Sequence, residues 1–346
     1  MAYFWASKSM DDLRGGAKAK LDVYRILSEN GFISSNLKIC EKVPQINRIL
    51  ELMRLLALPR TTDVVFQFPN YNRFNKFASF LTSLRHRVLF VVHDVDSIRD
   101  VPNHQSLSIL KRSHGCIVSG NLWRTAEMQA LDLRVQPLEC WDYLTSAPAT
   151  GEWSPAGKVL YAGSLSADKA AWLYDDRRQL PLYLAGVNYD LSRKLEADVF
   201  LGPFSSDCPS FPADVSWGVV WDGDSPFELA GKAGHYQWFN QPHKFSMYIA
   251  IGLPIICCKA AAMAQVVEKY GVGLCVDSLD DVPAAIAAVQ QDPDAADQIR
   301  ANVHALRARI VAGDFLRCAL LRFDLLLPDA DRQGIPQRLD PSRAAP

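Results

Sequence analysis

A polar segment, a short helix and an apolar strand follow one another in Gly234-His-Tyr-Gln-Trp-Phe-Asn-Gln-Pro-His-Lys-Phe-Ser-Met-Tyr-Ile-Ala-Ile-Gly-Leu-Pro-Ile-Ile-Cys-Cys258. Pro242 suits a first helical turn, where its missing N–H costs nothing, and Gly252 with Pro254 ends the helix before the strand. A helix N-terminus adds unpaired N–H groups and a partial positive charge. The side chains that can donate hydrogen bonds there are Asn240, Gln241, His243 and Lys244. Each of them alone also fits a capped surface helix, but together they predict an anion site, with phosphate as the anion.

The same segment contains a longer motif, Asn240-x-Pro242-His243-Lys244-x-Ser246-x-Tyr248-x-Ala250-x-Gly252-x-Pro254. With this motif it resembles the donor-binding segment of a bacterial family of GT-B glycosyltransferases. That family contains β-1,6-galactofuranosyltransferases and the glucosyltransferases that extend N-acetylglucosamine on serine-rich adhesins. The resemblance covers most of the chain, from Met1 to about Leu327, and its other stretches are Gly15–Asp22, Val88–Val95, Val159–Leu165 and Trp217–Gly223. One departure is the short start Tyr3-Phe-Trp-Ala-Ser7, onto which the acceptor contacts of relatives cannot be carried over.

The resemblance implies an α/β GT-B fold, in which two doubly wound Rossmann-like domains face a central cleft and a C-terminal helix crosses back to the first domain. It also implies transfer of a hexosyl group from a UDP-sugar to a saccharide acceptor, with inversion and without a metal. A UDP-sugar is then the donor substrate, no cofactor is expected, and the acceptor is a glycan, a lipid-linked saccharide or a glycoprotein. No nucleic acid is expected as a partner, and related enzymes often form homo-oligomers.

The residues alone predict a similar architecture. Nearly continuous apolar runs alternate with helical patterns, which indicates parallel sheets covered on both faces. Two such series indicate two doubly wound domains. The division is residues 1–148, then 155–312, with a linker near Thr145–Gly157 and a disordered tail at 329–346. The resemblance to GT-B enzymes implies that the helix over about 313–327 returns to the first domain. The predicted strands are Tyr3–Ser7, Val64–Phe68, Val88–Val92, Cys116–Ser119, Val159–Ala162, Leu182–Ala185, Val219–Trp221, Pro254–Cys258 and Gly273–Val276.

Composition restricts the class of protein. The 346 residues, 49% hydrophobic and 22% charged, suit two globular domains, and no apolar run or export signal predicts a membrane span or secretion. We therefore expect a cytoplasmic protein. The eight cysteines include no C-x-x-C pair, so neither zinc nor a disulfide framework is expected.

Charge is divided unequally between the two halves. Residues 1–150 hold 19 Lys and Arg against 14 Asp and Glu, a net charge of +5, whereas residues 151–346 hold 18 against 24, a net of −6. The asymmetry is either without function or it directs the basic half toward an anionic acceptor or the anionic inner membrane face. The helical pattern Pro44–Arg60, in which arginines flank a broad apolar side, either lies on such a membrane or packs on a sheet.

Several residues are candidates for the donor side of the cleft. Gly163 and Ser164 follow a strand and allow close approach of the backbone, although the pair also fits a plain turn. Lys169 lies six residues beyond Gly163, within reach of a diphosphate. An aromatic ring at a strand end can stack on uracil or pack in the core. The remaining donor-side candidates are Phe200 and Phe204 for the base, Asp222 at the strand before the donor helix, and Asn240, His243 and Lys244 for the diphosphate.

Sugar transfer requires a base for the acceptor hydroxyl and positive charge for the leaving diphosphate. Asp94, at the end of an apolar strand in the basic half, is the candidate base, although a carboxylate there also suits a turn or a helix cap. His93 is the alternative base or a partner of Asp94. The resemblance places Gly15, Gly16 and Lys18 in an acceptor-side loop.

Two other functions fit parts of the sequence. Asp94-Val-Asp96 and Asp222-Gly-Asp224 each match the D-x-D motif that holds a divalent metal in GT-A glycosyltransferases, although two α/β series fit that fold poorly. A non-catalytic nucleotide-sugar-binding or scaffolding subunit of a glycan assembly complex has the same fold. The sequence specifies neither the sugar, the acceptor nor the linkage.

Overall fold

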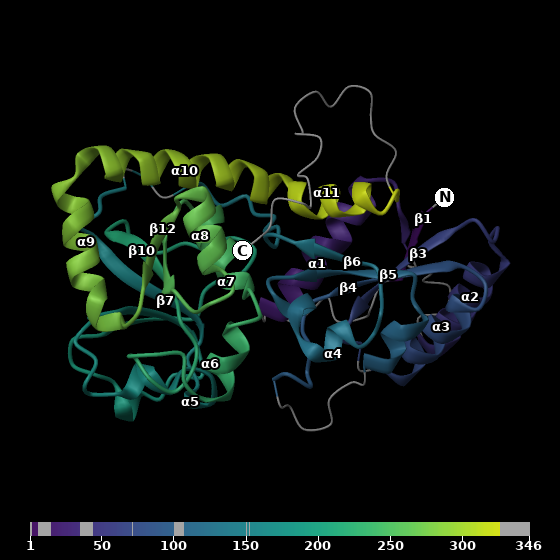
Figure 1. Cartoon of the computed structure of the whole chain (residues 1–346), viewed down its shortest axis with the longest axis horizontal. Helices are drawn as coiled ribbons and strands as arrows, with labels where there is room; N and C mark the ends of the chain where they lie inside the picture. The colour runs from purple at the N-terminus through teal and green to yellow at the C-terminus, as the bar shows by residue number, and fades with distance from the viewer. Residues whose placement is uncertain are drawn as a thin grey trace.

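The computed structural model describes residues 2–5, 15–34, 44–70, 72–99, 107–149, 151 and 153–325. These residues form two six-stranded parallel sheets, each surrounded by helices (Figure 1). The predicted tail at 329–346 lies outside the described residues. The two sheets are separated in the chain by residues 139–157, the segment that contains the predicted linker.

The first sheet has the strand order β2-β1-β3-β4-β5-β6, and every neighbouring pair is parallel. Its central strands are buried on both faces, as their continuous apolar runs predict. The strands are β1 (Ala2–Phe4), β2 (Ile33–Ser34), β3 (Asp63–Phe68), β4 (Arg87–Val92), β5 (Gly115–Ser119) and β6 (Val135–Leu138). The helices between them are α1 (Gly15–Glu29), α2 (Pro44–Ala57), α3 (Arg73–Ser83) and α4 (Ala126–Gln129), with 3-10 turns η1 (Leu107–Arg112) and η2 (Leu122–Arg124).

The second sheet has the order β12-β11-β10-β7-β8-β9 and is also entirely parallel. Its strands are β7 (Lys158–Ser164), β8 (Tyr183–Val187), β9 (Val199–Gly202), β10 (Val215–Val220), β11 (Ile255–Cys258) and β12 (Gly273–Val276). Its helices are α5 (Ala167–Ala170), α6 (Gly231–Gln237), α7 (His243–Ala250), α8 (Ala264–Tyr270) and α9 (Val282–Gln291), with 3-10 turns η3 (Ala171–Tyr174), η4 (Leu191–Arg193) and η5 (Leu279–Asp281). The prediction of two doubly wound units is confirmed.

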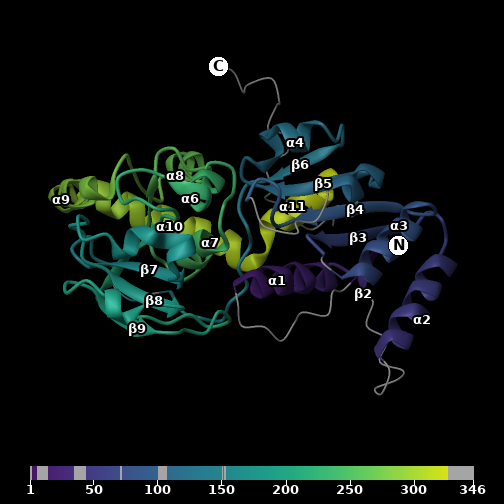
Figure 2. The same cartoon turned by 90° about the horizontal axis from the view of Figure 1, so that it is seen from below.

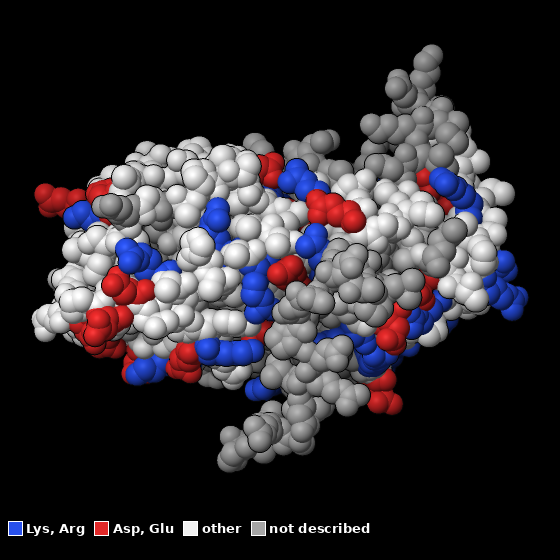
Figure 3. Space-filling view, turned by 90° about the horizontal axis from the view of Figure 1, so that it is seen from above, with Lys and Arg blue, Asp and Glu red and all other residues white. Residues whose placement is uncertain are grey.

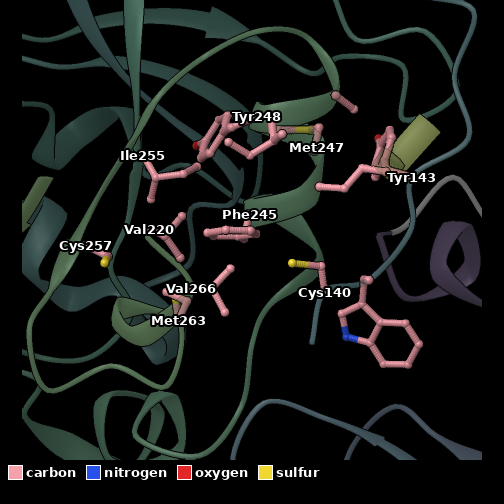
Figure 4. Packing of buried hydrophobic residues seen from close by; sticks show 14 of the residues in the cluster. Cys140, Tyr143, Val220, Phe245, Met247, Tyr248, Ile255, Cys257, Met263 and Val266 are labelled. Atoms are coloured by element: carbon pink, nitrogen blue, oxygen red, sulfur yellow. The ribbon is translucent and has the colours of Figure 1, made fainter. Parts of the chain in front are cut away.

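Helix α7 is held on the second sheet by Tyr248. The tyrosine ring lies over Gly218 of β10, where an added Cβ would be 2.3 Å from the ring. Its hydroxyl accepts a hydrogen bond of 2.6 Å from Ala162 N in β7. Figure 4 shows Phe245 and Tyr248 on the side of α7 that packs toward Val220, and Met247 on the side toward Tyr143. The core therefore fixes the rotation of α7 and so the direction in which its first residues point.

The C-terminal helices cross from the second sheet to the first, as predicted. Helix α10 (Pro293–Ala312) packs against α7, and α11 (Asp314–Arg322) packs against β6 and α1, which Figures 1 and 2 show as a continuous yellow bridge. Asp142 caps α11, because its carboxylate accepts hydrogen bonds from Phe315 N at 3.1 Å and Leu316 N at 2.8 Å. No helix among the described residues is both long and apolar enough to cross a membrane.

Candidate active site

A buried ion cluster lies where β7, β10 and α7 meet. Asp222 follows β10 and accepts hydrogen bonds from Lys244 Nζ at 2.7 Å and from the Tyr161 hydroxyl at 3.0 Å. Lys169 Nζ lies 3.6 Å from the other carboxylate oxygen of Asp222. The Lys244 ammonium also lies 3.9 Å from the centre of the Tyr161 ring, a cation–π contact. We call Tyr161, Lys169, Asp222 and Lys244 the Asp222 cluster.

The electrostatics of this cluster favour excess positive charge. Burial alone would raise the pKa of Asp222, but Lys169, Lys244 and the hydrogen bonds together lower it, so the carboxylate is ionised. Burial lowers the pKa of Lys244 to about 8, with Lys169 adding to the effect and Asp222 opposing it. The Lys244 side chain is only 8% exposed, whereas that of Lys169 is 40% exposed. Two ammonium groups and one carboxylate leave a net positive charge at the start of α7.

Backbone contacts hold the cluster together. Gly223 N donates to Lys169 O at 2.8 Å, and an added Cβ on Gly223 would lie 2.4 Å from Ala230 O. The φ of Gly223 is +120°, a conformation that favours glycine. Asp222 N donates to the side-chain oxygen of Gln237, in α6, at 3.0 Å. The loop after β10 is therefore positioned by both α5 and α6.

A second cluster of rings lies on the other side of the α7 N-terminus. The His93 imidazole stacks on Trp141 with centroids 4.7 Å apart and planes 4° apart. His243, the first residue of α7, lies against Tyr143 at 4.9 Å, and its Nε2 is 3.1 Å from Asp142 O. Adjacent residues of α7 thus reach opposite ways, His243 toward this ring cluster and Lys244 toward Asp222.

Both imidazoles of the ring cluster are neutral near pH 7. Burial lowers the pKa of His243 to about 3, and burial lowers the pKa of His93 as well, with Lys20 and His243 adding to the effect. His93 Nε2 lies 2.6 Å from the Gln67 side-chain oxygen, whose amide nitrogen in turn donates to Lys20 O. This arrangement assigns the proton of His93 to Nε2, and His93 Nδ1 has no partner among the described residues.

Asp94, the predicted base, differs from His93 in being accessible. Its side chain is 34% exposed, and its Oδ2 lies 3.5 Å from an Arg99 nitrogen. Its Oδ1 accepts a hydrogen bond of 3.1 Å from the Tyr236 hydroxyl of α6, in the other half of the molecule. Because the next residue of α6, Gln237, contacts Asp222, one helix connects the predicted base with the predicted donor side.

The structure corrects the prediction of an acceptor-side loop. Gly15, Gly16 and Lys18 belong to helix α1 rather than to a loop. Lys18 is buried and donates to Asp22 at 2.5 Å and to Leu144 O at 2.6 Å, so it anchors the chain after β6 instead of facing an acceptor. Lys20, which lies on a different side of α1, is the residue that interacts electrostatically with Asp94, whose charge opposes the lowering of the Lys20 pKa by burial.

The other donor-side candidates occupy several environments. Gly163 and Ser164 end β7, and the Ser164 hydroxyl lies 3.2 Å from that of Ser166. The Asn240 side-chain oxygen is buried without a hydrogen-bond partner among the described residues, which leaves it available to a ligand. Phe200 packs on Tyr189 at 5.0 Å and Phe204 on Phe211 at 5.2 Å, so both rings contact the core.

Sequence reasoning missed several residues of these clusters. Tyr161 and Gln237 complete the surroundings of Asp222, while Trp141 and Tyr143 complete those of His93. Tyr236 contacts Asp94. The sequence could have indicated Tyr161, because a tyrosine within an apolar strand is buried and its hydroxyl then requires a hydrogen-bond partner.

The two D-x-D tripeptides differ in surroundings. Asp222 is already paired with two lysines, and Asp96 is buried while Asp94 is partly exposed. Among the residues that the structure describes, no group of three or more His, Cys, Asp or Glu is arranged to hold a metal ion.

Comparison with known proteins gives the family. Residues 5–124 match the N-terminal domain of the glucosyltransferase 3-like family, and residues 159–323 match its C-terminal domain. The β-1,6-galactofuranosyltransferase WbbI of Escherichia coli (strain K12) is 26% identical over 332 residues, which cover 92% of this chain and 97% of that protein.

Solved glycosyltransferase structures share the fold at low sequence identity. An α-glucosyltransferase in complex with UDP superimposes with a TM-score of 0.57 and 10% identity, covering 94% of this chain and 98% of the other. The sucrose-phosphate synthase of Thermosynechococcus elongatus gives 0.53 and 13%, covering 94% and 97%. The GT-B arrangement that the sequence predicts is thereby confirmed. The two domain matches cover most of the chain, which belongs to the glucosyltransferase 3-like family of GT-B glycosyltransferases.

Proposed function

We propose that this glycosyltransferase moves a hexosyl group from a UDP-sugar to a saccharide acceptor during the assembly of a polysaccharide, lipopolysaccharide or glycoprotein glycan. The observation that carries the proposal is the Asp222 cluster, because it places two ammonium groups and the N-terminus of α7 at the ends of β7 and β10. Ligands of doubly wound sheets bind at that edge, and a diphosphate is the anion that such a group of donors suits.

The leaving UDP is stabilised by groups of the second domain. Lys169 and Lys244 supply positive charge for the diphosphate, and Asn240 supplies a polar side chain. Asp222 keeps the Lys244 ammonium in place, so that little reorganisation is needed as charge develops on the diphosphate. Gly163 and Ser164 allow the donor to approach the end of β7, and Phe200 or Phe204 provides a ring near the uracil. The donor domain in this proposal comprises residues 155–312.

The acceptor hydroxyl is deprotonated from the first domain, which comprises residues 1–148. Asp94 is the proposed base, because its carboxylate is partly exposed whereas the Nδ1 atom of His93 is buried. Inverting transfer requires attack from the face opposite the leaving UDP, so a base on the domain opposite the phosphate-binding residues suits it. In this mechanism His93 remains neutral and supports the site through its stacking on Trp141.

Transfer in this proposal is independent of a divalent metal. The support is that lysine ammonium groups already neutralise Asp222, which would otherwise be a metal ligand of the second D-x-D tripeptide. Transfer should therefore persist in excess EDTA. Loss of transfer in EDTA, with recovery on addition of Mn²⁺ or Mg²⁺, would favour the metal-dependent alternative instead.

A panel of UDP-sugars followed by thermal shift tests donor binding and identifies the sugar. A ligand at about 100 times its dissociation constant stabilises the folded state by roughly 2.7 kcal/mol, which is easily measured. Release of UDP from the best donor in the absence of acceptor then separates an enzyme from a binding subunit. No shift with any UDP-sugar contradicts the proposed donor class, and a shift without UDP release or transfer favours the scaffolding alternative.

The acceptor side of the proposal includes contact with a membrane. The excess of Lys and Arg in residues 1–150 suits a protein that works at the anionic inner face of a membrane, where lipid-linked acceptors lie. On the face shown in Figure 3, Lys and Arg side chains project from the right-hand end of the molecule, where the first domain lies.

A further inference from the structure

Helix α3 of the first domain buries several polar residues and exposes large apolar ones, while Phe74 and Leu81 pack against the core. Its buried residues are Asn75, Ala78, Ser79 and Thr82, three of which are polar. Each polar side chain is satisfied, since Asn75 accepts from the Trp5 indole at 3.0 Å, Ser79 donates to Lys76 O and Thr82 donates to Ala78 O. The opposite side of this segment carries apolar residues at helical spacing, namely Phe77, Phe80 and, at the C-cap, Leu84.

Helix α2, which packs against α3, is apolar on two sides. Leu52 and Leu55 face the core, and the side turned away from the core is apolar as well. The exposed apolar residues there are Ile46, Ile49, Leu50 and Met53. A helix that is apolar around most of its circumference is normally buried. We call these four residues and Phe77, Phe80 and Leu84 the α2–α3 face; each is between 36% and 66% exposed.

The charged residues around the α2–α3 face are almost all positive. Helix α2, helix α3 and turn η1 contain one carboxylate, Glu51, and it is buried against the Tyr3 hydroxyl. The same elements contain six cationic residues, namely Arg48, Arg54, Arg73, Lys76, Lys111 and Arg112. An apolar surface with cations and no exposed carboxylate in its own elements complements an anionic surface that also offers an apolar interior.

A pocket of about 260 Å³ opens beside these apolar residues, between α3 and η1. Lys76 and Arg112 line it together with the side chains of Ser79, Ser83 and Ser108, and the Arg112 guanidinium lies over the Phe80 ring at 4.6 Å. The ammonium of Lys76 and the guanidinium of Arg112 are charged donors of the kind that bind a phosphate monoester or diester. None of the residues lining this pocket belongs to the Asp222 cluster or the ring cluster.

The geometry points to the α2–α3 face as a docking surface for a bilayer that contains anionic phospholipid. The apolar side chains enter the acyl boundary, and Lys76 and Arg112 bind a headgroup phosphate in the adjoining pocket. Helices α2 and α3 lie at the end of the first sheet that is farther from the second domain (Figures 1 and 2), so docking there leaves the junction of the two domains uncovered. This inference rests on the membrane contact in the proposed function, for which it names the surface, and it does not depend on the assignment of the donor site.

A second copy of the chain is a poorer occupant of this surface. In a two-fold dimer the same patch faces itself, so the six cations of one copy would meet the six of the other. Like charges placed together at an interface oppose association. A bilayer with anionic headgroups removes this repulsion.

Flotation of the full chain with lipid vesicles tests the inference. We expect the protein to bind vesicles of phosphatidylcholine mixed with phosphatidylglycerol, to bind phosphatidylcholine alone much more weakly, and to be released from the mixture as salt is raised. The Phe77→Ser/Leu84→Ser double variant should lower the partition coefficient by at least about tenfold, because two apolar side chains no longer enter the bilayer. The Lys76→Gln/Arg112→Gln double variant should lower it by about tenfold or more for mixed vesicles only.

The matched control is Val187→Ser/Leu191→Ser, which removes two apolar side chains of similar exposure, 51% and 62%, from the second domain. Its partition should equal that of the wild type, and a thermal unfolding curve followed by circular dichroism shows for every variant that the chain is folded. Equal binding of the Phe77→Ser/Leu84→Ser variant, equal binding to both vesicle types, or no binding to either overturns the inference. So does sedimentation showing an oligomer that this double variant converts to monomer, because the face would then join copies of the chain.

Discussion

The Tyr236 hydroxyl donates a hydrogen bond of 3.1 Å to Asp94, and so connects the second domain to the carboxylate that we propose as the base. The same hydroxyl accepts from Val95 N at 3.1 Å, and the Arg99 guanidinium lies 5.5 Å from the Tyr236 ring centre. Asp94 is therefore oriented by a residue of the opposite domain. Any movement of one domain against the other changes the position of the base as well as that of the donor site.

Replacement of Tyr236 by Phe should separate orientation of the base from donor binding. The ring stays packed and only the hydroxyl is lost, so we expect UDP affinity to remain near that of the wild type. We expect kcat for transfer to fall about tenfold, since a hydrogen bond to a charged group contributes roughly 1.5–3 kcal/mol. Steady-state kinetics with calorimetry of UDP binding measures both quantities. An unchanged kcat would mean that the hydroxyl serves only the contact between the domains.

Removal of the Lys244 ammonium tests the donor site. Lys244→Ala should weaken UDP binding by about 1.5–3 kcal/mol, a loss of roughly ten- to a hundredfold, because a charge-assisted contact with the diphosphate disappears. Calorimetry on the folded variant gives the affinity directly. Lys259→Ala is the matched control, because Lys259 likewise pairs with a carboxylate, that of Asp277 at 2.6 Å, but is exposed.

The loss of Lys244 also leaves Asp222 buried with one fewer cation, which can destabilise the fold by itself. The double variant Lys244→Met/Asp222→Asn removes both charges and avoids this effect. If the double variant binds UDP as tightly as the wild type, Lys244 is a structural partner of Asp222 and not a phosphate ligand.

The strands that sequence patterns did not predict are at the sheet edges. Strand β2, with two residues, and strand β6, Val-Gln-Pro-Leu, are the outermost strands of the first sheet. Strand β2 has only two residues, and β6 contains a proline, which an edge strand tolerates, so both lack the continuous apolar run that marked the nine predicted strands. Central strands were predictable because burial on both faces constrains every residue.

The sequence predicted those site residues whose role follows from a local sequence pattern, but it did not predict their long-range partners. The position of Lys244 at the start of a helix before a strand is visible in the sequence, but its pairing with Asp222, 22 residues away, is not. The contact between Tyr236 and Asp94 spans 142 residues and depends on how the domains pack. The assignment of Lys18 failed for a different reason, because the side of α1 that faces the core decides which of Lys18 and Lys20 is near Asp94.

Donor binding should weaken as pH rises through about 8. Burial lowers the pKa of Lys244 from 10.5 to about 8, so the ammonium loses its proton where an exposed lysine would keep it. We expect the dissociation constant for UDP to rise about tenfold per pH unit above that value until the contact is lost. The pH dependence of folding stability has the opposite sign. Between pH 8 and 10.5 the unfolded chain holds the Lys244 proton more tightly than the folded chain does, so the contribution of Lys244 to the free energy of unfolding increases with pH in that range.

Calorimetry of UDP binding across this pH range measures the effect, and the Lys244→Met/Asp222→Asn variant identifies its source. A pH profile that remains flat up to pH 10 in the wild type, or that is equally steep in the variant, would assign the dependence to another group.

Conversion of Asp94 to Asn tests the base and the stereochemistry together. An inverting displacement requires the acceptor hydroxyl on the face opposite the leaving UDP, so the base belongs on the first domain, where Asp94 lies and Asp222 and Asp224 do not. Asn keeps the size and hydrogen bonding of Asp but not its basicity, and general base catalysis is typically worth about 10²–10⁴-fold. We therefore expect transfer to fall by about that factor in Asp94→Asn while UDP affinity stays near that of the wild type.

Asp224→Asn, at an exposed carboxylate of the second domain, should transfer normally. If Asp94→Asn transfers within a fewfold of the wild type, the role passes to His93, whose Nδ1 has no partner among the described residues. A product with the anomeric configuration of the donor would instead exclude the inverting mechanism.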